Sequence, residues 1–167
     1  MKITTLLAAA VALVPVAASA IALPAKTYVM KAGASDMFET ESSKLVLDSA
    51  NPKVASFAQM MITDHGKSTS DVMAAASADG MTPGAAMMTP KQKAMIDSLK
   101  RTSGSARDTL YIKDQIAAHR ATLMFQKQYA MTGDKPHLKD TAGMIVPAVE
   151  KHLDAVTAMA PMGVKAQ

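Results

Sequence analysis

Three stretches of the sequence place mostly apolar side chains at alternating spacings of three and four residues, and each carries a histidine at one of those positions. The stripes are Val54, Ala58, Met61, His65, Ser68 and Val72; Ile112, Ile116, His119 and Leu123; and Ile145, Val149, His152, Val156 and Met159. This spacing predicts amphipathic α-helices whose stripes face a common core. The fold must therefore accommodate three imidazoles inside an otherwise apolar interior.

The composition of the 167-residue chain favours one small helical domain. Hydrophobic residues make up 49% and charged residues 19%, which is too apolar for intrinsic disorder. Trp is absent and Tyr and Phe number three each, which disfavours an all-β domain. The absence of Cys excludes disulfides, thiolate metal sites and Cys nucleophiles. The net charge of +4 is spread without a Lys/Arg run, so we expect no nucleic-acid partner.

Residues 1–20 have the pattern of a cleaved signal peptide. Lys2 provides the positive start, residues 3–16 are apolar apart from two threonines, and Ala18-Ser19-Ala20 resembles a signal-peptidase site. A transmembrane anchor is the alternative, but the apolar stretch is shorter than the roughly 20 residues that span a bilayer, and Pro15 interrupts it. We expect an exported, periplasmic protein with no transmembrane segment in the mature chain; association with the outer membrane stays open.

Residues 21–167 are expected to form a single all-α domain. Turn and cap residues delimit four long helices, at about 24–48, 52–79, 106–132 and 136–160. The connection over residues 80–105 contains a short extra helix that begins at Thr89-Pro90. Short turns within each helix pair and one long connection between the pairs predict a ferritin-like antiparallel four-helix bundle.

Local signals define the ends and shape of these helices. Asn51-Pro52 is typical of an N-cap followed by proline at the first helical position, and Gly80 suits a left-handed C-terminal cap. Ser105, with Asp108 three residues later, resembles a capping box at the start of the third long helix. Pro147 lies inside the fourth long helix, where we expect a kink; two shorter helices meeting there are the alternative.

The three stripe histidines and one acidic residue are the candidate metal ligands. His65, His119 and His152 lie near the middle of their helices, and Glu39 lies at a comparable position along the first long helix. All four residues are between roughly 17 and 27 Å from a turn of the bundle. Imidazole nitrogens and a carboxylate oxygen suit zinc, iron, manganese or copper(II). Asp64 and Glu150 are close to a stripe histidine in sequence and are candidate hydrogen-bond partners of the ligands.

Other interpretations of these side chains stay open. The imidazoles and Glu39 could form a metal-free network with buried water, or they could lie at unrelated positions. His137, in the first turn of the fourth long helix, is expected at the surface. The 15 methionines also suggest copper(I) or silver binding through their thioether groups, with Met60-Met61 and Met87-Met88 as candidate ligands. Core filling is, however, the commoner use of methionine.

The spaced motifs resemble those of a family of exported bundles catalogued as domain of unknown function 4142, often labelled outer-membrane proteins. The matching residues are Glu39 ahead of Leu45; Asn51-Pro52-Lys53-Val54, Phe57-Ala58, Met61 and Asp64-His65; Tyr111-Ile112, Gln115 and His119; and Pro147 with His152-Leu153. The resemblance covers roughly Ala25 to Ala158. It implies a ferritin-like fold, and the family name implies no particular activity. Arg107 departs from the pattern, because an aromatic residue usually precedes Asp108.

The chain also departs from ferritins and di-iron oxidases, whose sites use Glu-x-x-His on two helices. The residues three before the stripe histidines are Ile62, Ile116 and Val149, so no carboxylate occupies this position. A di-iron centre is therefore not expected, and ferritin-like describes the shape alone.

Two functional hypotheses follow. In the first, a non-enzymatic exported bundle binds a divalent metal ion, or senses pH, through a buried His/Glu layer. In the second, the protein is a non-catalytic envelope interaction or stress-protection module in which the polar layer only fixes helix register. Its partner would be an envelope protein or a second copy. An enzyme is less expected, because no Ser/His/Asp set, Gly-rich phosphate loop or carboxylate pair can be named.

Overall fold

The computed structural model describes residues 23–161; the predicted signal peptide, residues 1–20, lies outside them. Five helices follow one another: α1 (Ala25–Lys44), α2 (Pro52–Ala78), α3 (Pro90–Lys100), α4 (Gly104–Thr132) and α5 (Pro136–Met159). The described part of the chain contains no strand, which confirms the predicted all-α class. None of these helices combines the length and the apolarity that a bilayer-spanning segment needs.

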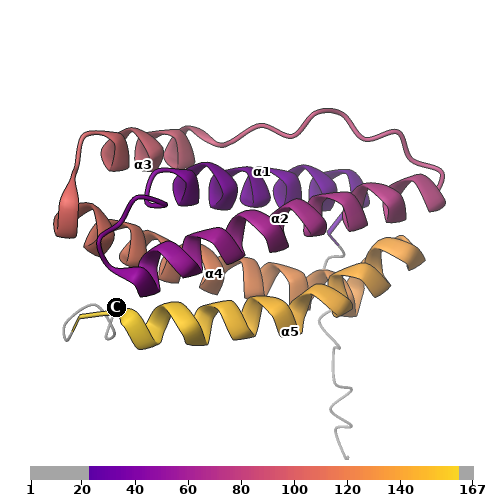
Figure 1. Cartoon of the computed structure of the whole chain (residues 1–167). Helices are drawn as coiled ribbons and strands as arrows, with labels where there is room; N and C mark the ends of the chain where they lie inside the picture. Colours follow the sequence, from indigo (N-terminus) through magenta and orange to yellow (C-terminus); the bar gives the residue numbers. More distant parts are fainter. Residues whose placement is uncertain (1–22, 162–167) are drawn as a thin grey trace, which may run out of the picture.

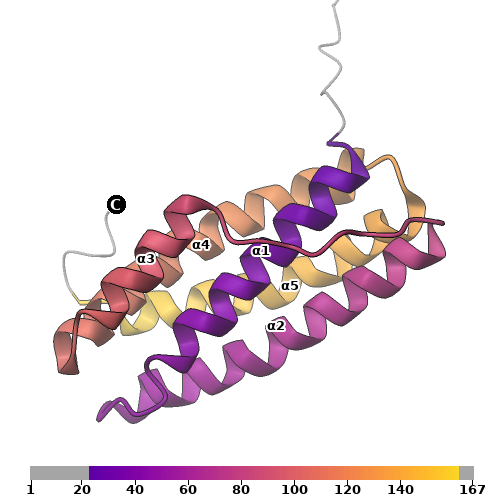
Figure 2. The ribbon, with the colours of Figure 1, turned by 90° about the horizontal axis from the view of Figure 1, so that it is seen from above.

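The four long helices lie side by side, and the short α3 lies against α1 and α4 (Figures 1 and 2). The main interfaces between long helices follow the cyclic order α1, α2, α5, α4. The extended connection after α2 returns along α1 before α3 begins (Figure 1). It approaches α1 closely at Gly33, where an added Cβ would meet the Cβ of Ala86 at 2.5 Å.

Capping residues explain both ends of α2 and the start of α3. The Asn51 side chain accepts a hydrogen bond from the Lys53 N–H at 3.1 Å with Pro52 at the first helical position, and Gly80 has φ +74°, as predicted. Thr89 and Gln92 form a reciprocal capping box at α3.

Two expectations about α4 and α5 are corrected or narrowed. The predicted capping box at Ser105 is wrong, because α4 begins at Gly104 with Ser103 as its N-cap and has no side-chain capping hydrogen bond. The Asp108 carboxylate instead accepts a hydrogen bond from Ser49 Oγ at 2.7 Å. Pro147 lies inside one uninterrupted α5, so the alternative of two separate helices is wrong.

The apolar core consists of two clusters. One gathers buried side chains from the end of the molecule where α2 begins, including Phe57, Met61, Tyr111 and Val156. The other gathers side chains from the opposite end, including Tyr28, Val72, Tyr129 and Leu138. Along each long helix the predicted site residues fall between the two clusters in sequence. A polar layer therefore divides the core.

A row of polar pairs joins α1 to α4 on both sides of this layer. Tyr28 donates to Gln126 at 2.9 Å near one end of the row, and Ser43 bonds Tyr111 at 2.7 Å near the other. Between them, Gln115 Nε2 donates to Ser42 Oγ at 3.1 Å. These bonds fix the antiparallel register of α1 against α4, because each pair has one geometry in which both groups are satisfied.

The α2–α5 junction is held by one carboxylate. Asp79, which follows α2, accepts hydrogen bonds from the backbone N–H groups of His137 and Leu138 at 3.2 and 2.9 Å and contacts His137 Nδ1 at 2.8 Å. It thus satisfies N–H groups of the first turn of α5, which that helix cannot satisfy itself. Burial raises the pKa of Asp79, but the bonds from Leu138 and His137 lower it more, and the net shift is downward.

Replacing Asp79 should loosen this junction. We expect Asp79→Ala to lower Tm by a few degrees at pH 7. A carboxylate whose pKa is depressed by folding stabilises above its ordinary pKa of 3.8 and loses that effect as the pH falls through the folded value. The difference in Tm between Asp79→Ala and wild type, measured by circular dichroism, should therefore disappear in acid. Asp154→Ala, at an exposed position of α5, is the control; an equal loss in both variants would contradict the assignment.

Candidate metal centre

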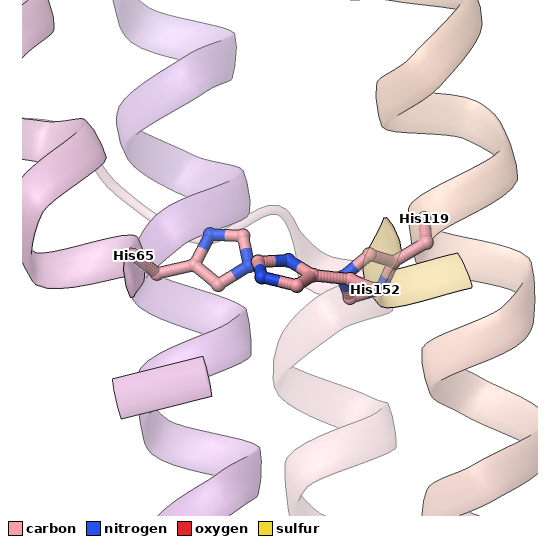
Figure 3. A group of neighbouring side chains, drawn as sticks. All are labelled: His65, His119 and His152. Carbon is pink, nitrogen blue, oxygen red and sulfur yellow. The ribbon is translucent and has the colours of Figure 1, made fainter. Parts of the chain in front are cut away.

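Three buried imidazoles meet at the centre of the bundle, one from each of α2, α4 and α5 (Figure 3). His65, His119 and His152 are 4%, 1% and 3% exposed. Their ring centroids are 5.5–5.7 Å apart. Each ring reaches this point because its residue continues the apolar stripe of its helix, which faces the core. The three stripes thus bring the histidines into one layer.

Each imidazole uses one ring nitrogen to bond an oxygen acceptor behind it. His65 Nδ1 lies 2.8 Å from Asp36 Oδ1, and His152 Nε2 lies 2.9 Å from Asp64 Oδ2. His119 Nδ1 lies 2.9 Å from the backbone carbonyl oxygen of Gln115. A carbonyl and an ionised carboxylate can only accept, so a neutral ring must donate its N–H at each of these bonds. This assigns the tautomer of all three rings.

The remaining nitrogens, His65 Nε2, His119 Nε2 and His152 Nδ1, are buried and have no hydrogen-bond partner among the described residues. In the assigned tautomers each of them carries a lone pair and no proton, so the rings cannot hydrogen-bond to one another. One nitrogen from each ring lies within 4.8 Å of one from each of the others. A single water has two protons and would leave one of the three lone pairs unsatisfied, whereas a cation can accept all three.

The outward bonds also prepare these rings as ligands. Metal-bound histidines usually donate their second ring N–H to a carboxylate or a backbone carbonyl, which fixes ring orientation and increases basicity. Three nitrogens on a tetrahedral zinc ion, at about 2.0–2.1 Å from the metal, stand about 3.4 Å apart.

Glu39 lies beside this cluster rather than within it. Its side chain is 1% exposed, its Oε1 is 3.7 Å from His119 Nδ1, and neither oxygen has a hydrogen-bond partner among the described residues. Nδ1 is the nitrogen that bonds Gln115, so Glu39 approaches His119 from the side away from its unpartnered nitrogen. Burial raises the pKa of Glu39 to about 7, opposed in part by attraction to His65.

The three imidazoles differ in the direction in which their surroundings shift the pKa. Burial and the neighbouring His65 lower the pKa of His119 to about 3. Burial also lowers the pKa of His152, against the hydrogen bond that its ring donates to Asp64. Burial lowers the pKa of His65 as well, but the bond to Asp36 and the charge of Glu39 outweigh it and the net shift is upward. Two rings therefore stay neutral near pH 7, and His65 is protonated first.

The other predicted residues lie in different surroundings. Asp64 contacts the imidazole of His152 on α5 and not that of His65, the next residue in the sequence. The Glu150 carboxylate, about half exposed, pairs with Lys127 Nζ at 2.6 Å. His137 is 59% exposed, Met61 is buried in the core and Met87 is exposed.

Sequence reasoning missed Asp36 and the Gln115 carbonyl. Asp36 is 5% exposed, and its second oxygen accepts a hydrogen bond from Thr69 Oγ1 at 3.0 Å. A signal for it was present, because Asp36 is three residues before Glu39 and four after the buried Ala32, on one helix face. A backbone carbonyl as partner has no sequence signal.

The raised pKa of Glu39 predicts a specific pH dependence of stability in the metal-free protein. A carboxyl whose pKa rises from 4.5 to about 7 on folding keeps its proton to a higher pH in the folded state than in the unfolded state. Its ionisation therefore lowers the free energy of unfolding progressively as the pH rises from 4.5 to about 7. Relative to wild type, Glu39→Gln should gain roughly 3 kcal/mol in unfolding free energy between pH 4.5 and 8. Urea unfolding with a chelator present measures this.

Glu41→Gln, at a half-exposed position on the same helix, should leave the pH profile of wild type unchanged. Parallel profiles for Glu39→Gln and wild type would show that Glu39 is not a buried carboxyl of raised pKa.

Comparisons with known proteins give a family and a fold. The family model described as "Domain of unknown function (DUF4142)" matches residues 11–159. A solved structure, titled as a crystal structure of a DUF305 fragment from Deinococcus radiodurans, matches with a TM-score of 0.70 and 12% identity over 81% of this chain and 93% of that one. At this identity the match supports the fold alone. Among curated proteins no relative was found. Since the family model spans most of the sequence, the chain belongs to the DUF4142 family.

Proposed function

We propose that this protein binds one divalent first-row metal ion through His65, His119 and His152. The observation that carries the proposal is the set of three buried ring nitrogens whose lone pairs have no donor among the described residues. Burying unsatisfied polar atoms costs about 1–3 kcal/mol each, so this arrangement is expensive without a bound species. A metal ion satisfies all three at once.

The charges around the layer favour a cation. Asp36, Glu39 and Asp64 each bring one carboxyl group to a different imidazole of the cluster, at 2.8 Å from His65, 3.7 Å from His119 and 2.9 Å from His152. With a bound divalent ion, ionised Glu39 is no longer an uncompensated buried charge, and the cation offsets the effect of burial that raises its pKa. In this proposal the Glu39 carboxylate balances the charge of the metal ion. It becomes a ligand only if its side chain turns toward the three unpartnered ring nitrogens.

The donor set narrows the choice of metal. Imidazole suits zinc, copper and iron, and the absence of cysteine excludes thiolate ligands. A three-histidine set leaves a tetrahedral ion with one coordination position open. Zinc and copper(II) are therefore the ions to test first. Because the sequence of residues 1–20 predicts export, the compartment we propose for this binding is the periplasm.

Metal binding should be measurable in a direct titration. Protein stripped with a chelator and then dialysed should bind one zinc ion per chain by calorimetry. It should melt about 5–10 °C higher when zinc exceeds its Kd a hundredfold. His65→Gln, His119→Gln and His152→Gln should each lose stoichiometric binding while keeping helical circular dichroism. Affinity should also fall in acid, where protons compete for the ring nitrogens.

His137→Gln is the matched control, since His137 lies outside the cluster and bonds Asp79. Loss of binding in this variant would move the site away from the cluster. Wild-type protein whose melting ignores zinc and copper(II) would favour the second hypothesis, an envelope module in which the histidines form a metal-free polar layer.

A further inference from the structure

A cleft of about 810 Å³ runs between α2 and α5 and reaches the histidine layer. His65 and His152 line it, whereas His119 and Glu39 do not. Both lining histidines are more than nine-tenths buried, and each has one unpartnered ring nitrogen. Two other cavities of the described structure are lined by none of the three imidazoles. The cluster is thus approached from the α2–α5 side.

The walls of this cleft are acidic. Four of its lining residues are aspartates, against one lysine; the aspartates are Asp36, Asp64, Asp71 and Asp140. The lysine, Lys67, pairs with Asp71 at 2.5 Å, so these two charges largely cancel and Asp36, Asp64 and Asp140 remain as the acidic groups of the lining. Asp64, whose side chain is 44% exposed, also bonds His152 and so joins the solvent-accessible part of the cleft to the buried layer. Such a field attracts cations and repels anions.

The size of the cleft fits a hydrated ion. Six waters around a divalent cation occupy about 180 Å³ at roughly 30 Å³ each, well within 810 Å³. The lining also contains small apolar residues, including Ala74 on α2 and Ala148 on α5. Ala148 is one helical turn before His152 on the same face of α5, so a large side chain there would obstruct the approach to the imidazole.

We propose that the α2–α5 cleft is the route by which the metal ion enters and leaves the three-histidine site, and that its aspartates admit the ion as a hydrated cation and exclude anionic metal complexes. This rests on the proposed function. A route changes the barrier between free and bound ion without changing the bound state. It therefore governs the rates of association and dissociation equally and leaves Kd nearly unchanged.

Stopped-flow binding of Co²⁺, followed by its visible absorption, tests the route. Ala148→Phe should slow association and dissociation each by about tenfold, with Kd from chelator competition within about threefold of wild type. Ala158→Phe, at an exposed position of α5 outside the cleft, should bind at the wild-type rate. If Ala148→Phe does not fold, Ala148→Leu takes its place with a smaller expected slowing.

Asp140, an exposed residue of the cleft wall, tests the charge. Asp140→Asn should reduce the association rate severalfold at low ionic strength, and the difference should vanish in about 0.5 M salt, where the charge is screened. Asp154→Asn, exposed on α5 outside the cleft, is its control.

The possible results separate the two proposals. Wild-type protein that binds no Co²⁺, Zn²⁺ or Cu²⁺ refutes the proposed function. Tight binding with unchanged rates in Ala148→Phe keeps the metal site but overturns the route. Unchanged association rates in Asp140→Asn at low salt overturn the selection of cations. So does loading from an anionic zinc chelate at the rate of free zinc, if that rate does not fall when excess chelator removes the free ion.

Discussion

Everything in the centre of this protein depends on the direction of three imidazole rings. Because a carboxylate, a carbonyl and a second carboxylate hold the outer nitrogens of His65, His119 and His152, the inner nitrogens all present lone pairs to the same space when the three rings are neutral. Acceptors that face acceptors gain nothing from each other. The arrangement is therefore incomplete by itself, and a cation is the simplest species that completes it.

The division of the core explains how the fold supports such a layer. Apolar clusters lie on both sides of it and contribute the hydrophobic stabilisation on which a domain of this size depends. The polar layer can then carry a buried carboxyl such as Glu39 at a net cost to the metal-free protein. Natural proteins commonly accept such local costs at functional sites.

Hydrophobic periodicity predicted the stripes of α2, α4 and α5 and the three histidines on them, because the stripes run through His65, His119 and His152. It said much less about α1 and about the α1–α4 interface. Polar residues such as Ser42 and Gln115 are buried there in matched pairs, so the faces that pack together do not look apolar in the sequence. Which polar groups pair across helices depends on register, which no single helix encodes.

The same limit applies to the partners of the histidines. Asp64 was named because it adjoins His65, yet it bonds His152, since an interhelical contact decides its partner. Glu150 is two residues before His152, but side chains two residues apart on a helix point in different directions. The Glu150 carboxylate instead pairs with Lys127. Asp36 was missed although it shares a helix face with Glu39. Proximity in sequence is a poor guide to hydrogen-bond partners in a bundle.

Anomalous diffraction at the zinc absorption edge, from crystals grown with one equivalent of zinc, tests the central claim most directly. The account predicts one strong peak, about 2.0–2.1 Å from each of His65 Nε2, His119 Nε2 and His152 Nδ1, with the outer bonds to Asp36, Gln115 and Asp64 preserved. A peak only at Asp79 and His137, or ordered water in place of metal at the histidine layer, would contradict it.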